Sequence, residues 1–231
     1  MRGKKRGFSI NWYIIALILC LNVFSAVIYP SLPEMVPSHW NISGEVDGYI
    51  PKIAHVIGLP TLTLVVYLLM ALAPFADPKP ESYRKFSGVF EGFRIIMVFV
   101  LASLYVATSI VALGYNLPVG KIAMVIIGVM LVYTGNYFGK IRHNFTFGIK
   151  TPWTLANEEV WNKTHRVSGP LWVTAGIIWM ISVVLPERAA FIIDLSVLLA
   201  VSLYGVVYSY ILFKKLNPPG GGNGSKGWDG K

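Results

Sequence analysis

The sequence lacks the residues that would build a disulfide or a cysteine-based metal site. Cys20 is the only cysteine among 231 residues, which excludes an intrachain disulfide and any site with several cysteine ligands. It ends the apolar segment Leu17-Ile18-Leu19-Cys20, and a lipoprotein cleavage site would need a small residue where Leu19 stands. We therefore expect Cys20 to be a small apolar residue inside a membrane helix.

Charged residues are also scarce, and acidic residues are the scarcer kind. Charged residues make up 13% of the chain and hydrophobic residues 55%, with a mean hydropathy of +0.59, a balance outside that of soluble proteins. The net charge of +9 would suggest a nucleic-acid partner in a soluble protein. In a chain this apolar, we expect the basic residues to lie in cytoplasmic loops beside anionic lipid headgroups. Membrane lipid is thus the expected partner, and no direct contact with nucleic acid is expected.

Long apolar runs make up most of the chain. The first follows a basic start, but no small-x-small cleavage site follows it, so it is interpreted as a retained helix and not as a signal peptide. Six runs are each close to the length that crosses a bilayer, and they cover about residues 12–29, 53–75, 94–113, 121–139, 171–185 and 190–213. The predicted fold class is all-α, an integral membrane bundle of six transmembrane helices.

The basic residues predict the orientation of this bundle. With the N-terminus inside, 17 lysine and arginine residues fall in cytoplasmic segments and three in outer segments. Because positively charged loops stay on the cytoplasmic side, we expect both termini to be cytoplasmic. The polar loop 30–52 is then extracellular, and the polar loop 140–169 is cytoplasmic.

This topology divides the chain into four parts. They are a two-helix unit with an ordered extracellular loop (1–75), a third helix with its flanking loops (76–119), a unit with the cytoplasmic loop (120–213) and a flexible tail (214–231). No internal repeat is evident, so nothing indicates an inverted-repeat transporter. Small residues four apart, such as Gly135 with Gly139 and Gly205 with Ser209, let helices approach closely. That spacing fits contacts within one bundle and equally a homo-oligomer.

The outer loop is too constrained to be a simple linker. Pro33 and Pro37 stiffen its first part, and Gly44 and Gly48 bracket a predicted turn containing Asp47. We expect the loop to fold back over the bundle.

The same loop contains residue types that bind metals. Those in and beside it are Glu34, His39, Glu45, Asp47 and His55, but their order lacks a recognised ligand spacing. We therefore favour a hydrogen-bonded His39 in a structural cap over a metal site, and we predict neither a metal nor a cofactor.

The inner loop carries a helix start. Asn157 can cap a helix whose first turn holds Glu158 and Glu159, and the predicted helix runs from there to Val167 and ends at Gly169-Pro170.

On this helix Glu158, Trp161 and His165 share one face. An interfacial helix with no further role explains this face, and a ligand or partner site built on Trp161 and His165 is the main alternative. Catalysis by His143, His165 and Glu158 is not favoured, since no nucleophile, oxyanion donor or metal triad accompanies them. A membrane enzyme or a small-molecule transporter stays open as an alternative function, and so does a metal on His39, His143 or His165.

Two motifs together resemble a known family. The run from Asn136 to Arg166, N…H-N-x-x-x-G-I-K-T-P-W-T-L…W-x-K-T-H-R, resembles the signature of the SdpI family. The outer loop, L-P-x-x-V-P-S-H-W-N-x-x-G-E-V-D-G, is similar to a small domain of unknown function that precedes the signature in many members. Lys150 departs from the family, which usually has arginine there. Arginine can donate two parallel hydrogen bonds to one partner, whereas the lysine ammonium is a compact single charge.

The resemblance implies a polytopic membrane protein related to the immunity and signalling protein of a bacterial cannibalism system. Such a protein protects the cell from a secreted peptide toxin and captures a cytoplasmic repressor at the membrane. In the outer loop, we predict that the residues that bind a toxin or signal are Pro33, Pro37, His39, Trp40, Gly44, Asp47 and Gly48. The family's motif residues correspond here to Asn136, Asn144, Gly148, Pro152, Trp153, Thr154, Trp161, His165 and Arg166. With Lys150 and Glu158, these are the residues that we predict to bind a repressor-like protein inside.

Overall fold

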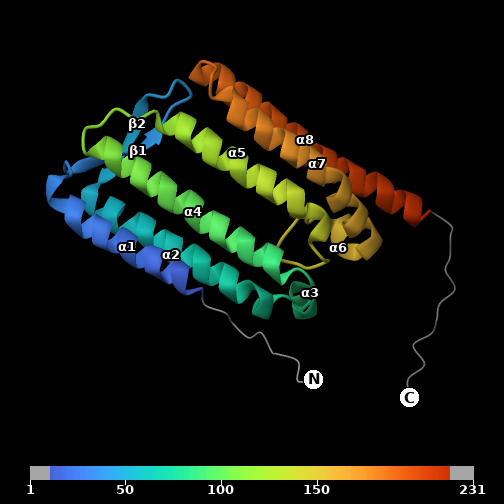
Figure 1. Cartoon of the computed structure of the whole chain (residues 1–231). Coiled ribbons are helices and arrows are strands. Elements are labelled where there is room, and N and C mark those ends of the chain that lie inside the picture. The colour runs from blue at the N-terminus through green and yellow to red at the C-terminus, as the bar shows by residue number, and fades with distance from the viewer. Residues whose placement is uncertain (1–10, 219–231) are drawn as a thin grey trace.

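The apolar runs form long helices that lie side by side, with a small hairpin at one end of the bundle (Figure 1). This computed structural model describes residues 11–218. Its elements are α1 (Trp12–Ile28), η1 (Tyr29–Ser31), β1 (Met35–Trp40), β2 (Val46–Pro51), α2 (Lys52–Ala76), α3 (Pro80–Lys85), α4 (Ser87–Ala112), α5 (Val119–Tyr137), η2 (Phe138–Lys140), α6 (Pro152–Ala156), α7 (Glu158–Ser182) and α8 (Glu187–Leu216).

Five helical segments in the described part of the chain are long and apolar enough to cross a membrane. They are Trp12–Ser31, Lys52–Ala76, Ser87–Ala112, Val119–Lys140 and Glu187–Leu216, and each contains most or all of one predicted run. The remaining run, 171–185, lies largely in α7, whose first half is too polar to meet the same test. The protein is a multi-pass membrane protein.

Glycines let α5 and α7 approach each other closely. A Cβ on Gly135 would lie 2.6 Å from the carbonyl oxygen of Gly169, and one on Gly176 would lie 2.5 Å from that of Gly128. α7 packs on its other side against α8, while α4 packs between α2 and α5. The predicted close packing at Gly135 is thus a contact within one bundle, whereas a Cβ on Gly139 would meet nothing within 4 Å.

The outer loop corrects the all-α expectation, because it contains an antiparallel pair of strands. β1 pairs with β2 from Met35 opposite Pro51 to Trp40 opposite Val46, with register shifts after Pro37. Proline disfavours a strand, and such irregularities are where a sheet accommodates it. Val36 is fully buried and packs beside the ends of α2 and α4.

The predicted turn in this loop is wrong. Asp47 and Gly48 lie inside β2, and the chain reverses at residues 41–45 instead. There the side-chain oxygen of Asn41 accepts from the backbone N–H groups of Ser43 and Glu45, and Gly44 has a φ of +79°. An asparagine that bonds its own backbone is a turn signal, and of the two glycines only Gly44 lies in the observed turn.

The predicted cytoplasmic helix starts where expected but ends much later. The Asn157 side chain accepts from the N–H groups of Glu159 and Val160. α7 then passes through Gly169 and Pro170 without a break and continues to Ser182. Proline is tolerated within membrane helices because neighbouring groups satisfy the freed backbone, so the expected end at Gly169-Pro170 is wrong.

α8 continues to Leu216, so residues 214–216 of the predicted flexible tail are helical. The basic start, Arg2 to Arg6, and the glycine-rich residues from 219 to 231 lie outside the described residues. Large apolar side chains on α8, including Leu199, Leu203 and Ile211, are about 60% exposed and suit contact with lipid.

Candidate functional site

The two predicted sites lie at opposite ends of the bundle. The hairpin β1–β2 is at one end, and α3 and α6 are at the other (Figure 1). We call residues 141–157, which connect η2 to α7, the signature loop.

Asn144 folds the first part of the signature loop. Its amide nitrogen donates to the carbonyl oxygens of Arg142 (2.8 Å) and Phe147 (2.9 Å). Its amide oxygen accepts from the N–H groups of Thr146 (2.9 Å) and Phe147 (2.6 Å). The side chain is fully buried and both ends of its amide are used within the loop, so Asn144 shapes this turn and is not free to bind a ligand.

Asp77, which the sequence analysis did not single out, fastens this turn to the end of α2. One of its carboxylate oxygens accepts from the Phe145 N–H (2.8 Å), the Thr146 hydroxyl (2.9 Å) and the Tyr83 hydroxyl (3.2 Å). Burial raises the pKa of Asp77, but its hydrogen bonds outweigh burial and hold the pKa below its usual value. Burial raises the pKa of Tyr83 to about 12, so this hydroxyl keeps its proton and donates it. A lone acid between an apolar run and two prolines was the only sequence signal.

Trp161 and His165 hold the loop against α7. The indole N–H of Trp161 donates to the Ile141 carbonyl (2.9 Å), and Nε2 of His165 accepts from the Ile149 N–H (2.9 Å). Because Nε2 accepts, the ring proton lies on Nδ1 and is donated to the Trp161 carbonyl, 2.8 Å away. Burial lowers the pKa of His165 to about 4. A neutral imidazole with both nitrogens bonded is a positioning group, with neither nitrogen free for a metal or for proton transfer.

Gly148 is required by the same contact. Its φ is +125°, and a Cβ there would lie 2.5 Å from Nε2 of His165 and 3.0 Å from two ring carbons of Trp161. No other residue fits both this backbone conformation and this space.

Thr151 and Thr154 attach the end of the loop to α8. Their side chains and backbones form a capping box that starts α6, and the Thr151 hydroxyl also bonds that of Ser209 on α8 at 2.9 Å. The Trp153 ring packs on Tyr210, with ring centroids 4.9 Å apart. The signature loop therefore contacts the end of α2, α7 and α8 together.

His143 is buried beside Trp161, with ring centroids 5.2 Å apart. The Lys79 ammonium lies 2.7 Å from its Nδ1 and donates to it. Burial and the charge of Lys79 hold the pKa of His143 below its usual value. Within residues 11–218, no group of three or more His, Cys, Asp or Glu side chains is placed to hold a metal.

At the hairpin end, His39 and Asp47 pair across the two strands. Nδ1 of His39 lies 2.5 Å from a carboxylate oxygen of Asp47, and both side chains are exposed. A Cβ on Gly48 would lie 2.9 Å from that of His39, so glycine makes room for this pair. Pro33 is exposed and Pro37 half-buried.

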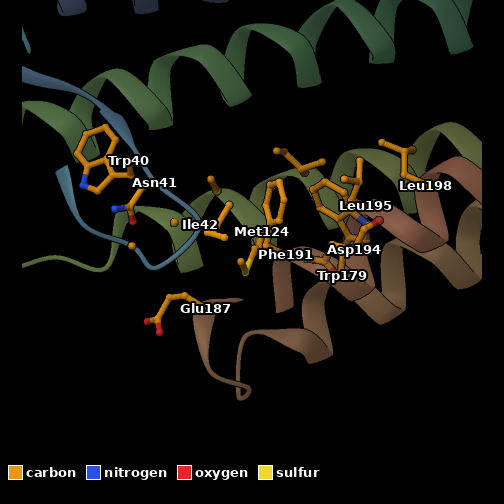
Figure 2. A pocket seen from close by; sticks show the side chains of 14 residues that line it. Trp40, Asn41, Ile42, Met124, Trp179, Glu187, Phe191, Asp194, Leu195 and Leu198 are labelled. Carbon is orange, nitrogen blue, oxygen red and sulfur yellow. The ribbon is translucent and has the colours of Figure 1, made fainter. Parts of the chain in front are cut away.

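The hairpin tip closes a cavity of about 280 Å³ against three helices. Trp40, Asn41, Ile42 and Gly44 border it from the hairpin, and side chains of α5, α7 and α8 form the other walls (Figure 2).

Two regions of the chain match models of known protein families. Residues 140–212, which hold the signature loop, α7 and most of α8, match the model of the SdpI/YfhL protein family. This part of the chain is therefore similar to the SdpI/YfhL family. Residues 16–64, which include most of α1, the hairpin and half of α2, match a domain of unknown function, DUF1648.

One curated relative matches over nearly its full length. The chain is 28% identical over 203 residues to "Immunity protein SdpI" of Bacillus subtilis (strain 168), which is 87% of this chain and 95% of that protein. No solved structure matches.

The residues predicted for the cytoplasmic site fall into two groups. Asn144, Thr154, Trp161 and His165 are fully buried and hold the loop together, and Gly148 gives them room. Trp153 is half-buried, and the exposed remainder consists of Asn136, Lys150, Pro152, Glu158 and Arg166. Sequence reasoning found most of the residues but could not tell the two groups apart, and it missed Asp77, Thr151 and Ser209.

Proposed function

We propose that this protein is an integral membrane immunity protein that protects its cell from a peptide toxin. The observation that carries the proposal is the match to an immunity protein over 95% of that protein's length. The match also covers 87% of this chain, which supports a shared overall mode of action.

We further propose six membrane crossings, with both termini inside. The 17-to-3 distribution of basic residues supports this orientation, and so does the packing of α7 against both α5 and α8. Because only residues 183–186 separate α7 from α8, a membrane-crossing α8 requires α7 to run back beside it. The hairpin then faces outward and the signature loop faces the cytoplasm.

Cysteine labelling tests this topology in a Cys20→Ala background. Ser43→Cys at the hairpin tip should react with a membrane-impermeant maleimide in intact cells. Asn162→Cys, on the exposed side of α7, should react only after permeabilisation. Labelling of both residues in intact cells would refute the orientation.

In this proposal the toxin meets the hairpin, and His39 and Trp40 are central to that contact. Inside, a repressor-like protein meets the exposed signature residues, above all Lys150 and Arg166. The two ends communicate only if the toxin binds two states of the bundle with different affinity. The signature loop is suited to respond to such a change of state, because a shift of α8 relative to α7 would strain the hydrogen bond between Thr151 and Ser209.

The decisive experiment expresses the protein in toxin-sensitive cells and measures survival. His39→Ala with Trp40→Ala should abolish protection. Lys150→Glu with Arg166→Glu should leave protection intact but should release a tagged repressor from the membrane fraction. The four substituted residues are exposed or half-exposed, so the variants should fold and insert normally. Equal amounts of each variant in the membrane fraction are the control for this. If the two pairs of substitutions have the same effect, the two-sided model is wrong.

A further inference from the structure

The cavity under the hairpin tip contains a carboxylate whose bonding is incomplete. Asp194 on α8 is only 3% exposed, and it lies in the cavity wall near Trp179 and Leu195 (Figure 2). One carboxylate oxygen accepts from the Ser182 hydroxyl at 3.0 Å. The other, Oδ1, is buried and has no hydrogen-bond partner among the residues that the structure describes.

An unbonded buried carboxylate oxygen is costly, since a buried polar group needs a partner to replace water. Ser182 and the Trp179 indole, which donates to the backbone carbonyl of Asp194 at 3.0 Å, fix the residue in the wall. Neither of these two side chains donates a hydrogen bond to Oδ1.

The rest of the cavity is apolar except at its mouth. Met124, Phe191 and Leu198 are among its walls, and Glu187 stands at the hairpin side. Glu187 faces Lys121 at 3.7 Å, whereas Asp194 forms no ion pair with a basic side chain among the described residues. The cavity thus suits a group with an apolar stem and a positively charged end.

The size of the cavity points to a side chain as its occupant. About 280 Å³ is near the lower end of the roughly 300–1,000 Å³ of ligand pockets, and it has room for one long side chain. A lysine side chain buries its methylene stem against apolar surface and presents an ammonium at its tip. An anionic lipid headgroup, by contrast, would be repelled by Asp194 and Glu187.

We propose that this cavity is the anchor site for a lysine side chain of a peptide that binds at the outer face. The ammonium bonds Oδ1 of Asp194, the stem packs on the apolar walls, and the hairpin tip covers the neighbouring peptide backbone. This inference rests on the proposed immunity function and names the chemistry of the toxin segment that the protein recognises.

The test uses the full-length protein in phosphatidylcholine nanodiscs and two labelled peptides, acetyl-Ala-Leu-Lys-Leu-Ala and its norleucine analogue. Norleucine keeps the stem and removes the ammonium. A bond to a charged group contributes about 1.5–3 kcal/mol, so the lysine peptide should bind at least about tenfold more tightly in fluorescence anisotropy. Asp194→Asn should reduce this preference to within about twofold. Glu45→Gln, an exposed hairpin carboxylate outside the cavity, should leave it unchanged.

A second variant separates loss of the site from loss of the fold. Ala123→Met narrows the cavity from α5 without touching Asp194 and should weaken both peptides about equally. Equal binding of the two peptides to the unaltered protein would overturn the proposal, as would a preference that survives Asp194→Asn. Loss of the preference in phosphatidylethanolamine nanodiscs would show a lipid amine in the cavity and would also overturn it. Survival of toxin-treated cells expressing the unaltered protein tests the immunity function separately, so the two failures are distinguishable.

Discussion

Replacing Gly148 with alanine should detach the signature loop from α7 without unfolding the bundle. The new methyl group would lie 2.5 Å from Nε2 of His165 and 3.0 Å from the Trp161 ring, on a backbone with a φ of +125°. Either the backbone must leave this conformation or the two rings must move. In both cases the bond from the Ile149 N–H to His165 is lost.

The size of the effect follows from these contributions. A residue other than glycine in this backbone region costs about 1–3 kcal/mol, and an extra methyl group in a packed site costs about 1–3 kcal/mol. A lost buried hydrogen bond adds about 1 kcal/mol. The free energy of loop opening should therefore fall by at least about 3 kcal/mol, which corresponds to roughly a hundredfold faster amide exchange.

Hydrogen exchange of the protein in nanodiscs measures this directly for the amides of Phe147 and Ile149. Gly139→Ala is the matched control, because a Cβ there meets nothing within 4 Å and the residue has no positive φ. Exchange in α5 should stay slow in both variants. If Gly148→Ala exchanges no faster than Gly139→Ala, the clash is relieved more easily than the structure indicates and this account of the signature glycine is refuted.

Three further predictions concern the attachments of the same loop. Because the pKa of Asp77 is held below its usual value, its carboxylate stabilises the loop at neutral pH, and this contribution is lost as the pH falls through that lowered pKa. Asp77→Asn should speed exchange at Phe145 at pH 7 and remove that acid dependence. Between pH 6.5 and 4 the unfolded loop binds a proton that buried His165 does not, so loop stability should fall by about 3 kcal/mol across this range. Because His143 titrates in the same direction, this exchange series is measured in a His143→Asn background, and a flat profile would contradict the assignment. Thr151→Val and Ser209→Ala should each destabilise the α8 contact by about 1 kcal/mol, and a double variant no worse than either alone would show that the two hydroxyls act as one pair.

Much of the fold could be predicted from the apolar runs and from the residues that begin or end helices. Apolar runs of bilayer length form helices because a membrane offers the backbone no other hydrogen-bond partners, and five of these runs are long apolar helices in the structure. The start of α7 could be predicted equally well, since Asn157 and the two acidic residues after it stabilise a helix start through contacts with residues next to them in the chain. The end of α7 was not, because whether Pro170 stops a helix depends on what packs around it.

The candidate site, too, could be predicted only in part from the sequence. The motifs in the sequence identified the residues of the signature loop and their family, because both are properties of residue order. Only the tertiary structure showed that Trp161 and His165 are buried supports while Lys150 and Arg166 face outward. Asp77, Ser209 and Asp194 could not be assigned from sequence, since their partners lie 68, 58 and 12 residues away. Order along the chain determined which helices form. The approach of distant helices decided which polar groups are bonded internally and which, such as Oδ1 of Asp194, have no partner among the described residues.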